Sequence, residues 1–143
     1  MLRLSLARHA FAWSVAATAV LSMHSQAVAQ PGDERPSVTL RASPAVAFAP
    51  ARIVLSANVL GGANDFEGFY CPTVEWDWGD GTTSSSQADC APYEAGKSQI
   101  RRRYTVEHIY RQPGAFRIFF RLKKNTRVNG IAQANVQVRA GLP

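Results

Sequence analysis

The sequence predicts an all-β domain of the sandwich or barrel class, and three observations support this. Apolar and polar residues alternate with a period of two in several short segments, as in strands with one buried face. Glycine, proline and asparagine, which favour turns, separate these segments. No window of the sequence has the period of an amphipathic helix. Short strands joined by such turns build a sandwich or a barrel.

The first 29 residues predict a secretory signal peptide that precedes this domain. Arg3 and Arg8 form a short positive region, residues 10–21 are apolar, and Ala27-Val28-Ala29 has the small-x-small pattern of a signal peptidase site. The apolar run is too short and wrongly flanked for a membrane span. We therefore expect a secreted or periplasmic protein, and the alternative is an uncleaved N-terminal anchor. After signal cleavage we expect no membrane span.

Residues 30–36 would then form a flexible lead-in, because they are polar and contain two prolines. Residues 37–140 form the expected domain. Loss of the signal peptide lowers the formal net charge from +6 to +4. This mild positive charge does not indicate a nucleic-acid partner, which an exported protein would rarely meet.

Four segments alternate clearly enough to be assigned as half-buried strands. Their inward residues are Val38, Leu40 and Ala42; Ile53, Leu55, Ala57 and Val59; Phe116, Ile118, Phe120 and Leu122; and Ala132, Ala134, Val136 and Val138. Residues 74–78 form a further strand, with Val74, Trp76 and Trp78 on one face. The stretch TTSSSQ, residues 82–87, is interpreted as a solvated loop.

The last two alternating strands predict a hairpin whose turn contains Asn129-Gly130. A two-residue loop would set core residues opposite surface residues, which the pleat of a sheet forbids. A three-residue loop, residues 128–130, places Leu122 opposite Val136. We therefore expect a type I turn with a glycine bulge, a positive φ at Gly130, and disruption of the hairpin by Gly130→Val.

The exported chain contains two cysteines, Cys71 and Cys90. In an oxidising compartment an even count this small predicts one disulfide. The disulfide would close a loop of about 20 residues and stabilise the fold by about 3 kcal/mol in the chain-entropy model. The alternatives are a metal pair or a redox pair, although redox cysteines normally stand two residues apart.

Residues 75–81, EWDWGDG, combine two tryptophans with a turn sequence. In strand register the tryptophans face the core, and Gly79-Asp80-Gly81 ends the strand. About thirty residues later come His108-Ile109-Tyr110 and Gly114-Ala115-Phe116-Arg117-Ile118. The two motifs together resemble the signature of the PKD (polycystic kidney disease) domain, W-D-F-G-D-G followed by H-x-Y-x-x-x-G-x-Y-x-V. Three core positions differ conservatively, with Trp78 for Phe, Phe116 for Tyr and Ile118 for Val.

This resemblance covers nearly the whole exported chain, about residues 37–139. It implies an immunoglobulin-like β-sandwich of about seven strands, and an extracellular, non-catalytic module that contacts proteins, carbohydrates or a parent enzyme's substrate. It implies structural roles for the motif residues Trp76, Asp77, Trp78, Gly79, Asp80, Gly81, His108, Tyr110 and Gly114. Residues 81–99 depart from the family pattern, and we interpret them as an insertion held by the disulfide.

The resemblance also implies contacts for four of these residues. Asp77 and Asp80 would accept hydrogen bonds from backbone N–H groups of the turn. Tyr110 would donate its hydroxyl to the backbone before the following strand, as in the tyrosine corner of related sandwiches. His108 would pack beside Tyr110.

Metal and catalytic sites have weaker support. The carboxylates that would suit calcium are Glu75, Asp77, Asp80 and Asp89, but their spacing is not that of an EF-hand. After signal cleavage His108 is the remaining histidine, which is too few for a zinc site. Residues 84–86 would supply serines beside His108 and Asp80 for a hydrolase, but no nucleophile elbow surrounds them. A glycosidase cleft would have little room in 114 residues. We expect no metal site, no cofactor and no catalytic residue.

One face of the sandwich is a candidate binding surface. In an immunoglobulin-like order the strand with Trp76 pairs with residues 116–122, and its outward acids would pair with outward arginines there. The candidate residues are Arg117, Phe119, Arg121, Gln133 and Asn135. Phe119 is an aromatic residue on the solvent side among polar donors and acceptors, which suits sugar or protein ligands. Incidental exposure is the alternative, and burial of Phe119 would remove the hypothesis.

Arg101-Arg102-Arg103 forms a second basic cluster. Arg102 faces inward by alternation, so it would need a partner such as Asp89 or Glu94. The run would protect a strand edge or bind anionic polymers of the cell envelope.

We interpret the chain as an exported binding or interaction module with an unidentified protein or carbohydrate partner in the envelope or extracellular space. The second hypothesis is a structural or accessory subunit of an envelope or secreted enzyme complex.

Overall fold

The computed structural model describes residues 35–141, so the predicted signal peptide and most of the lead-in lie outside the described residues. Eight strands and one short helix follow in the order β1 (Ser37–Ser43), β2 (Val46–Phe48), β3 (Ala51–Leu60), η1 (Glu67–Phe69), β4 (Thr73–Asp77), β5 (Thr83–Gln87), β6 (Arg103–Tyr110), β7 (Gly114–Lys124) and β8 (Arg127–Arg139). Among residues 35–141 there is no helix long and apolar enough to cross a membrane.

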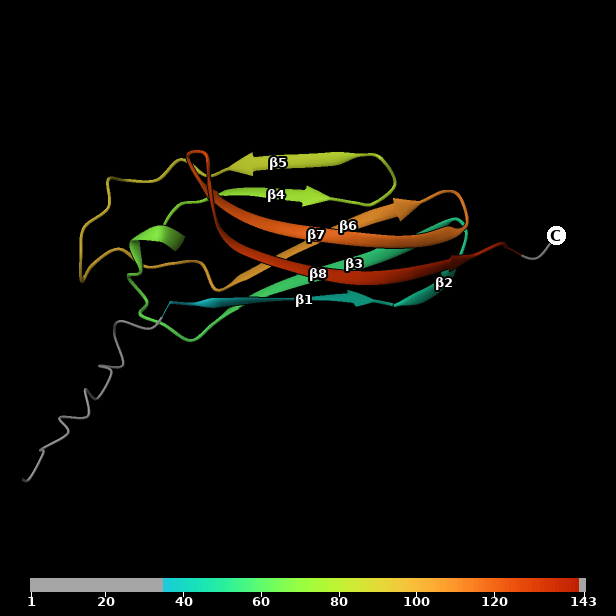
Figure 1. Cartoon of the computed structure of the whole chain (residues 1–143), viewed down its shortest axis with the longest axis horizontal. Coiled ribbons are helices and arrows are strands. Elements are labelled where there is room, and N and C mark those ends of the chain that lie inside the picture. Colours follow the sequence, from blue (N-terminus) through green and yellow to red (C-terminus); the bar gives the residue numbers. More distant parts are fainter. Residues whose placement is uncertain (1–34, 142–143) are drawn as a thin grey trace, which may run out of the picture.

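The strands form two packed sheets, a three-stranded sheet β1-β3-β6 and a five-stranded sheet β2-β8-β7-β4-β5 (Figure 1). The short β2 runs parallel to β8, whereas the other pairs are antiparallel. This is the all-β, immunoglobulin-like sandwich that the sequence predicts, with one strand more than the seven expected.

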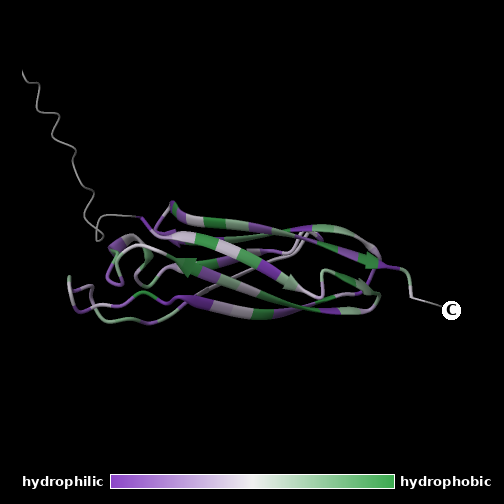
Figure 2. Cartoon of the chain, turned by 90° about the horizontal axis from the view of Figure 1, so that it is seen from below, coloured by the Kyte–Doolittle hydropathy of each residue, from purple (hydrophilic) through white to green (hydrophobic). Residues whose placement is uncertain are grey.

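The core lies between the sheets and follows the predicted alternation. Along the strands hydrophobic and hydrophilic residues take turns, as Figure 2 shows. In β3 the residues Ala51, Ile53, Leu55, Ala57 and Val59 are buried, and Ile118, Phe120, Leu122, Val136 and Val138 meet them from β7 and β8. Each fully buried side chain of this size contributes about 1.5–3 kcal/mol to folding.

The β7–β8 hairpin differs from the predicted one. Lys124 pairs with Arg127, so the turn lies at Asn125-Thr126, where Asn125 has a φ of 54°. Leu122 therefore pairs with Gly130, and not with Val136. A bulge beside Leu122 shifts the register by one residue, so that inward residues still face each other. The predicted requirement that core residues face core residues across the hairpin is met. A bulge within the strands meets it, and not a three-residue turn.

Gly130 is needed for space and not for a positive φ, which corrects the reason predicted from the sequence. It is buried in β8 beneath β1 and η1. A Cβ atom at this position would lie 2.7 Å from Cγ2 of Val38 and 3.1 Å from Cε1 of Phe69. Both neighbours belong to the packed core region, so neither can move aside without cost.

The stretch read as a solvated loop contains a strand, β5, which pairs with β4 from Thr73↔Gln87 to Asp77↔Thr83. All five of its side chains are exposed. Its sequence therefore has no apolar alternation, and main-chain pairing forms the strand. The predicted disulfide between Cys71 and Cys90 is present and holds the loop after β5 against the start of β4.

Arg102 has a different partner from the predicted one. Its guanidinium donates to the carbonyls of Gly61 and Gly62 and to Oδ1 of Asn64, the last at 2.7 Å, and forms no ion pair with Asp89 or Glu94. The inward charge is thus satisfied by the loop that follows β3. Since charged hydrogen bonds of this kind contribute more than neutral ones, Arg102 fixes that loop to the start of β6.

We expect Gly130→Ala to lower the free energy of unfolding by about 1–3 kcal/mol, because an added methyl group overpacks the core. Gly130→Val should cost more. Urea denaturation followed by tryptophan fluorescence would measure the change. The control is Ile131→Val at the neighbouring position, which is 54% exposed, with an expected change within about 0.5 kcal/mol. Parent-like stability of Gly130→Ala would contradict the crowding.

Arg102→Met should lower the free energy of unfolding by about 2 kcal/mol or more, because the loop carbonyls lose a charged donor. Arg103→Met is the matched control, since Arg103 is exposed and its guanidinium makes one side-chain hydrogen bond within residues 35–141, to the half-buried Asn58 at 3.3 Å. Equal losses in the two variants, measured by urea denaturation, would show that the loop contacts of Arg102 are unimportant.

Candidate functional site

The EWDWGDG motif builds a column of rings between the two sheets. The rings of Trp76 in β4 and Trp78 just after it are 5.6 Å apart and nearly parallel. Trp78 stacks on His108 of β6 with ring centroids 4.3 Å apart and an interplanar angle of 3°. His108 meets Tyr110 edge to face at 4.7 Å. Because β4 and β6 belong to different sheets, the column joins the two layers.

Hydrogen bonds fix the turn that follows this column. Asp77 accepts from the Gly79 N–H at 3.2 Å, and Asp80 accepts from the Thr82 N–H at 3.0 Å. These are the acceptor roles that the family resemblance implies. Gly79 has a φ of +73°, and a Cβ there would lie 2.5 Å from the Arg117 carbonyl oxygen. The position therefore requires glycine for two reasons, the positive φ and the lack of space for a side chain.

Tyr110 and His108 attach β6 to the same turn. The Tyr110 hydroxyl donates to the Trp78 carbonyl at 2.8 Å, which corrects the expectation that it would reach the backbone before β7. Burial raises the pKa of Tyr110 above its usual value, so the hydroxyl remains a donor. Nε2 of His108 lies 2.7 Å from Oδ2 of Asp80.

The pKa of Asp80 is lowered, although burial by itself would raise it, because hydrogen bonds from Thr82 and His108 to its carboxylate outweigh the burial. The His108–Asp80 pair has the chemistry of a catalytic dyad without a nucleophile. No serine hydroxyl hydrogen-bonds to His108 in the described part of the chain. Within residues 35–141, no group of three or more histidine, cysteine or acidic side chains could hold a metal ion. The contacts that the structure shows for these motif residues are structural ones.

The five predicted face residues lie together on the outer face of the five-stranded sheet. Arg117 pairs with Asn135, and Phe119 pairs with Gln133 across β7 and β8. Arg117, Gln133 and Asn135 are exposed. Their side chains form no hydrogen bond or ion pair with the rest of residues 35–141, so their donors and acceptors are free for a ligand.

Phe119 and Arg121 are less available than the other three. Arg121 bonds Glu75 at 3.0 Å and lies 3.8 Å from Asp77, the cross-strand pairing that the sequence predicts. Its guanidinium also covers the half-buried Phe119 ring at 5.2 Å. A hydrogen bond from Lys123, opposed by burial and aided by the charges of Lys123 and Arg121, lowers the pKa of Glu75. We call Glu75, Asp77, Arg121 and Lys123 the ion-pair lattice.

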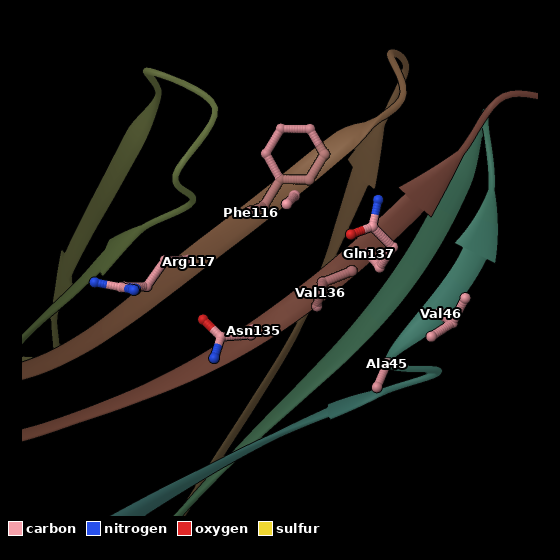
Figure 3. A pocket seen from close by; sticks show the side chains of 8 residues that line it. Ala45, Val46, Phe116, Arg117, Asn135, Val136 and Gln137 are labelled. Atoms are coloured by element: carbon pink, nitrogen blue, oxygen red, sulfur yellow. The ribbon is translucent and has the colours of Figure 1, made fainter.

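Beside the free polar residues the outer face has an open depression of about 480 Å³. It is lined by Ala45, Val46, Ala115, Phe116, Arg117, Asn135, Val136 and Gln137 (Figure 3). Two of the predicted face residues, Arg117 and Asn135, line it, whereas Phe119, Arg121 and Gln133 do not. The small side chain of Ala115 leaves the space that the longer side chains surround.

Sequence reasoning missed the contribution of β2. Val46 is 51% exposed and lines the depression from a strand of three residues. A strand this short, with Pro44 and Pro50 on either side, has no readable alternation. Its pairing with the end of β8 arises from tertiary contact.

Comparison with solved structures shows which fold this arrangement shares. The PKD domain of an M14-like peptidase from a Thermoplasmatales archaeon matches 73% of this chain and 96% of its own, with 11% identity and a TM-score of 0.50. The CARDB domain of the PF1109 protein from Pyrococcus furiosus, crystallised with di-metal ions, matches 76% of this chain and 97% of its own, with 14% identity and a TM-score of 0.43. No protein-family model and no curated protein match the chain. The chain therefore has a PKD-like fold.

The lowered pKa values of Asp80 and Glu75 predict acid destabilisation. At acidic pH the unfolded state binds more protons at these groups than the folded state does. Their stabilisation is thus complete above the unfolded pKa of about 4 and is lost as the pH falls through the folded values.

Asp80→Asn should lower the thermal midpoint at pH 7, because His108 loses a charged partner. Between pH 7 and pH 3 the thermal midpoint of this variant should fall by less than that of the parent protein. Calorimetry at both pH values would measure this. Asp89→Asn, in the exposed loop, is the control. A parent-like fall in the Asp80→Asn variant would show that Asp80 does not contribute.

Proposed function

We propose that the chain is an exported, non-catalytic binding module, and that it contacts a protein or a carbohydrate through the outer face of its five-stranded sheet. The observation that carries this proposal is the set of free polar side chains on adjacent strands, Arg117, Gln133 and Asn135, beside the open depression. Guanidinium and amide groups donate and accept the hydrogen bonds that sugar hydroxyls and peptide groups require. The PKD-like fold supports the assignment to a domain module.

The shape of the site favours binding over turnover. The depression is open, and no titratable acid or base among its lining residues stands beside a nucleophile. Its walls combine the apolar Val46 and Ala115 with Arg117, Asn135 and Gln137. Such a surface can recognise a ligand by shape and hydrogen bonds, but offers no pair of groups for proton transfer.

A structural or accessory subunit is the second candidate function. Val46 and Phe48 are 51% and 57% exposed, and both belong to β2 at one edge of the sheet. A large protein partner would cover these apolar side chains, whereas a small glycan in the depression would leave Phe48 in water.

A glycan array and a pull-down from envelope extract would test both functions with the disulfide-bonded protein. We expect Arg117→Ala/Asn135→Ala to weaken binding at least tenfold, because both side chains lose their ligand contacts. Arg41→Ala/Thr105→Ala, on exposed positions of the other sheet, is the matched control and should bind like the parent. A ligand that both variants retain equally would contradict the outer-face site.

A further inference from the structure

The edge of the five-stranded sheet at β5 is open. β5 is the outermost strand, and Figure 1 shows no strand beyond it among the described residues. Trp78 N–H donates to the Thr82 carbonyl at 3.1 Å, which sets the phase of the β4–β5 ladder. Backbone groups in an antiparallel ladder point alternately toward and away from the partner strand. The N–H and C=O groups of Thr83, Ser85 and Gln87 therefore point outward, with the spacing that an added strand would match.

β5 also lacks the features that protect sheet edges. Its sequence, TSSSQ, has no charge and no proline, and its pairing with β4 contains no bulge. The other edge of this sheet, β2, has three residues. In the smaller sheet the edge strand β6 carries Arg103 and Glu107 on its exposed side. Within residues 35–141, β5 thus differs from the edge strands β2 and β6 in having neither a very short length nor charged side chains.

A groove of about 320 Å³ lies beside the inner side of this edge. Its walls include Tyr70, Pro72, Val74 and Tyr104, and Ser86 of β5 borders it. Ser86 pairs with Val74, whose side chain is in the core, so Ser86 faces the same side. A side chain on an added strand next to Ser86 would face this side too, and would enter the groove.

Arg101 gives the groove a charge. It lines the groove, and its guanidinium lies 4.9 Å from the centre of the Tyr104 ring. The Arg101 side chain donates to the Arg103 carbonyl. No carboxylate in the described part of the chain forms an ion pair with it. An acidic side chain on the incoming strand would complement this guanidinium.

We propose that β5 and this groove form a docking site for an extended peptide of a partner protein. The peptide adds to β5 as a further strand, inserts an aliphatic or aromatic side chain into the groove, and places a carboxylate near Arg101. A second copy of this chain fits less well, because its own β5 would offer only uncharged polar side chains to the apolar walls and to Arg101. The site is separate from the outer face that carries the proposed function.

A phage-displayed library of random twelve-residue peptides, selected on the disulfide-bonded protein, would test this proposal. We expect the enriched sequences to combine residues of high β-propensity with an apolar residue near an aspartate or glutamate. A fluorescent peptide of the strongest sequence would then serve as the probe in anisotropy titrations. Its binding should slow hydrogen exchange at the amides of Thr83, Ser85 and Gln87.

Ser85→Pro is the decisive variant, since it removes an outward N–H without removing a bond to β4. We expect it to weaken the peptide at least tenfold, while Ser85→Ala, which keeps the N–H, stays within about twofold, a difference below 0.5 kcal/mol. Arg101→Glu should weaken an acidic peptide and spare its amide version. Arg117→Ala/Asn135→Ala should leave this binding unchanged, which separates the site from the outer face.

Three results would overturn the proposal. They are the absence of any enriched peptide, peptides that bind Ser85→Pro as tightly as the parent, and a dimer in sedimentation equilibrium that Ser85→Pro dissociates. The last result would assign the edge to a second copy. If Ser85→Pro fails to fold, unchanged exchange at the three β5 amides on peptide binding to the parent protein would also refute it.

Discussion

The stack of Trp76, Trp78 and His108 is the contact on which the two-layer arrangement depends. The two tryptophans come from β4 and its following turn, and the histidine comes from β6 in the opposite sheet. Asp80 holds the histidine and the Thr82 N–H together, and Tyr110 holds the Trp78 carbonyl. Asp77, Asp80 and the glycines of EWDWGDG therefore fix the turn that keeps these rings aligned, whereas Glu75 belongs to the ion-pair lattice.

The unequal sizes of the two sheets decide which surfaces of the sandwich stay uncovered. The stack joins β4 to β6, and β5 extends the larger sheet by one strand beyond this contact. All residues of β5 are consequently exposed. On the outer face the ion-pair lattice covers β4 and part of β7, because its acids and bases satisfy one another. The free polar residues of β7 and β8 lie on one side of the lattice, and the open edge lies on the other.

Much of the fold could be predicted from the sequence, because burial on one side of a strand imposes a period of two. The inward residues of β3, such as Ile53 and Leu55, and those of β7, such as Phe120, are buried as that period requires. The same reasoning placed Arg117 and Asn135 on one outer face and predicted that outward arginines pair with the acids of β4. It could not say that Arg121, and not Arg117, would be the arginine that Glu75 and Asp77 engage. β2 and β5 escaped prediction because one is too short, and the other too exposed, to show the alternation.

The sequence by itself determined the class of fold, the disulfide and the faces of the long strands, since hydropathy and residue chemistry act locally along the chain. Tertiary structure alone decided the register of β7 against β8, because a turn at Asn125-Thr126 with a bulge obeys the same alternation as a longer turn at Gly130. It also decided that Arg102 binds loop carbonyls and that β5 is an open edge. These features depend on which backbone groups come into contact across the sandwich, and the pattern of residues along the chain does not specify those contacts.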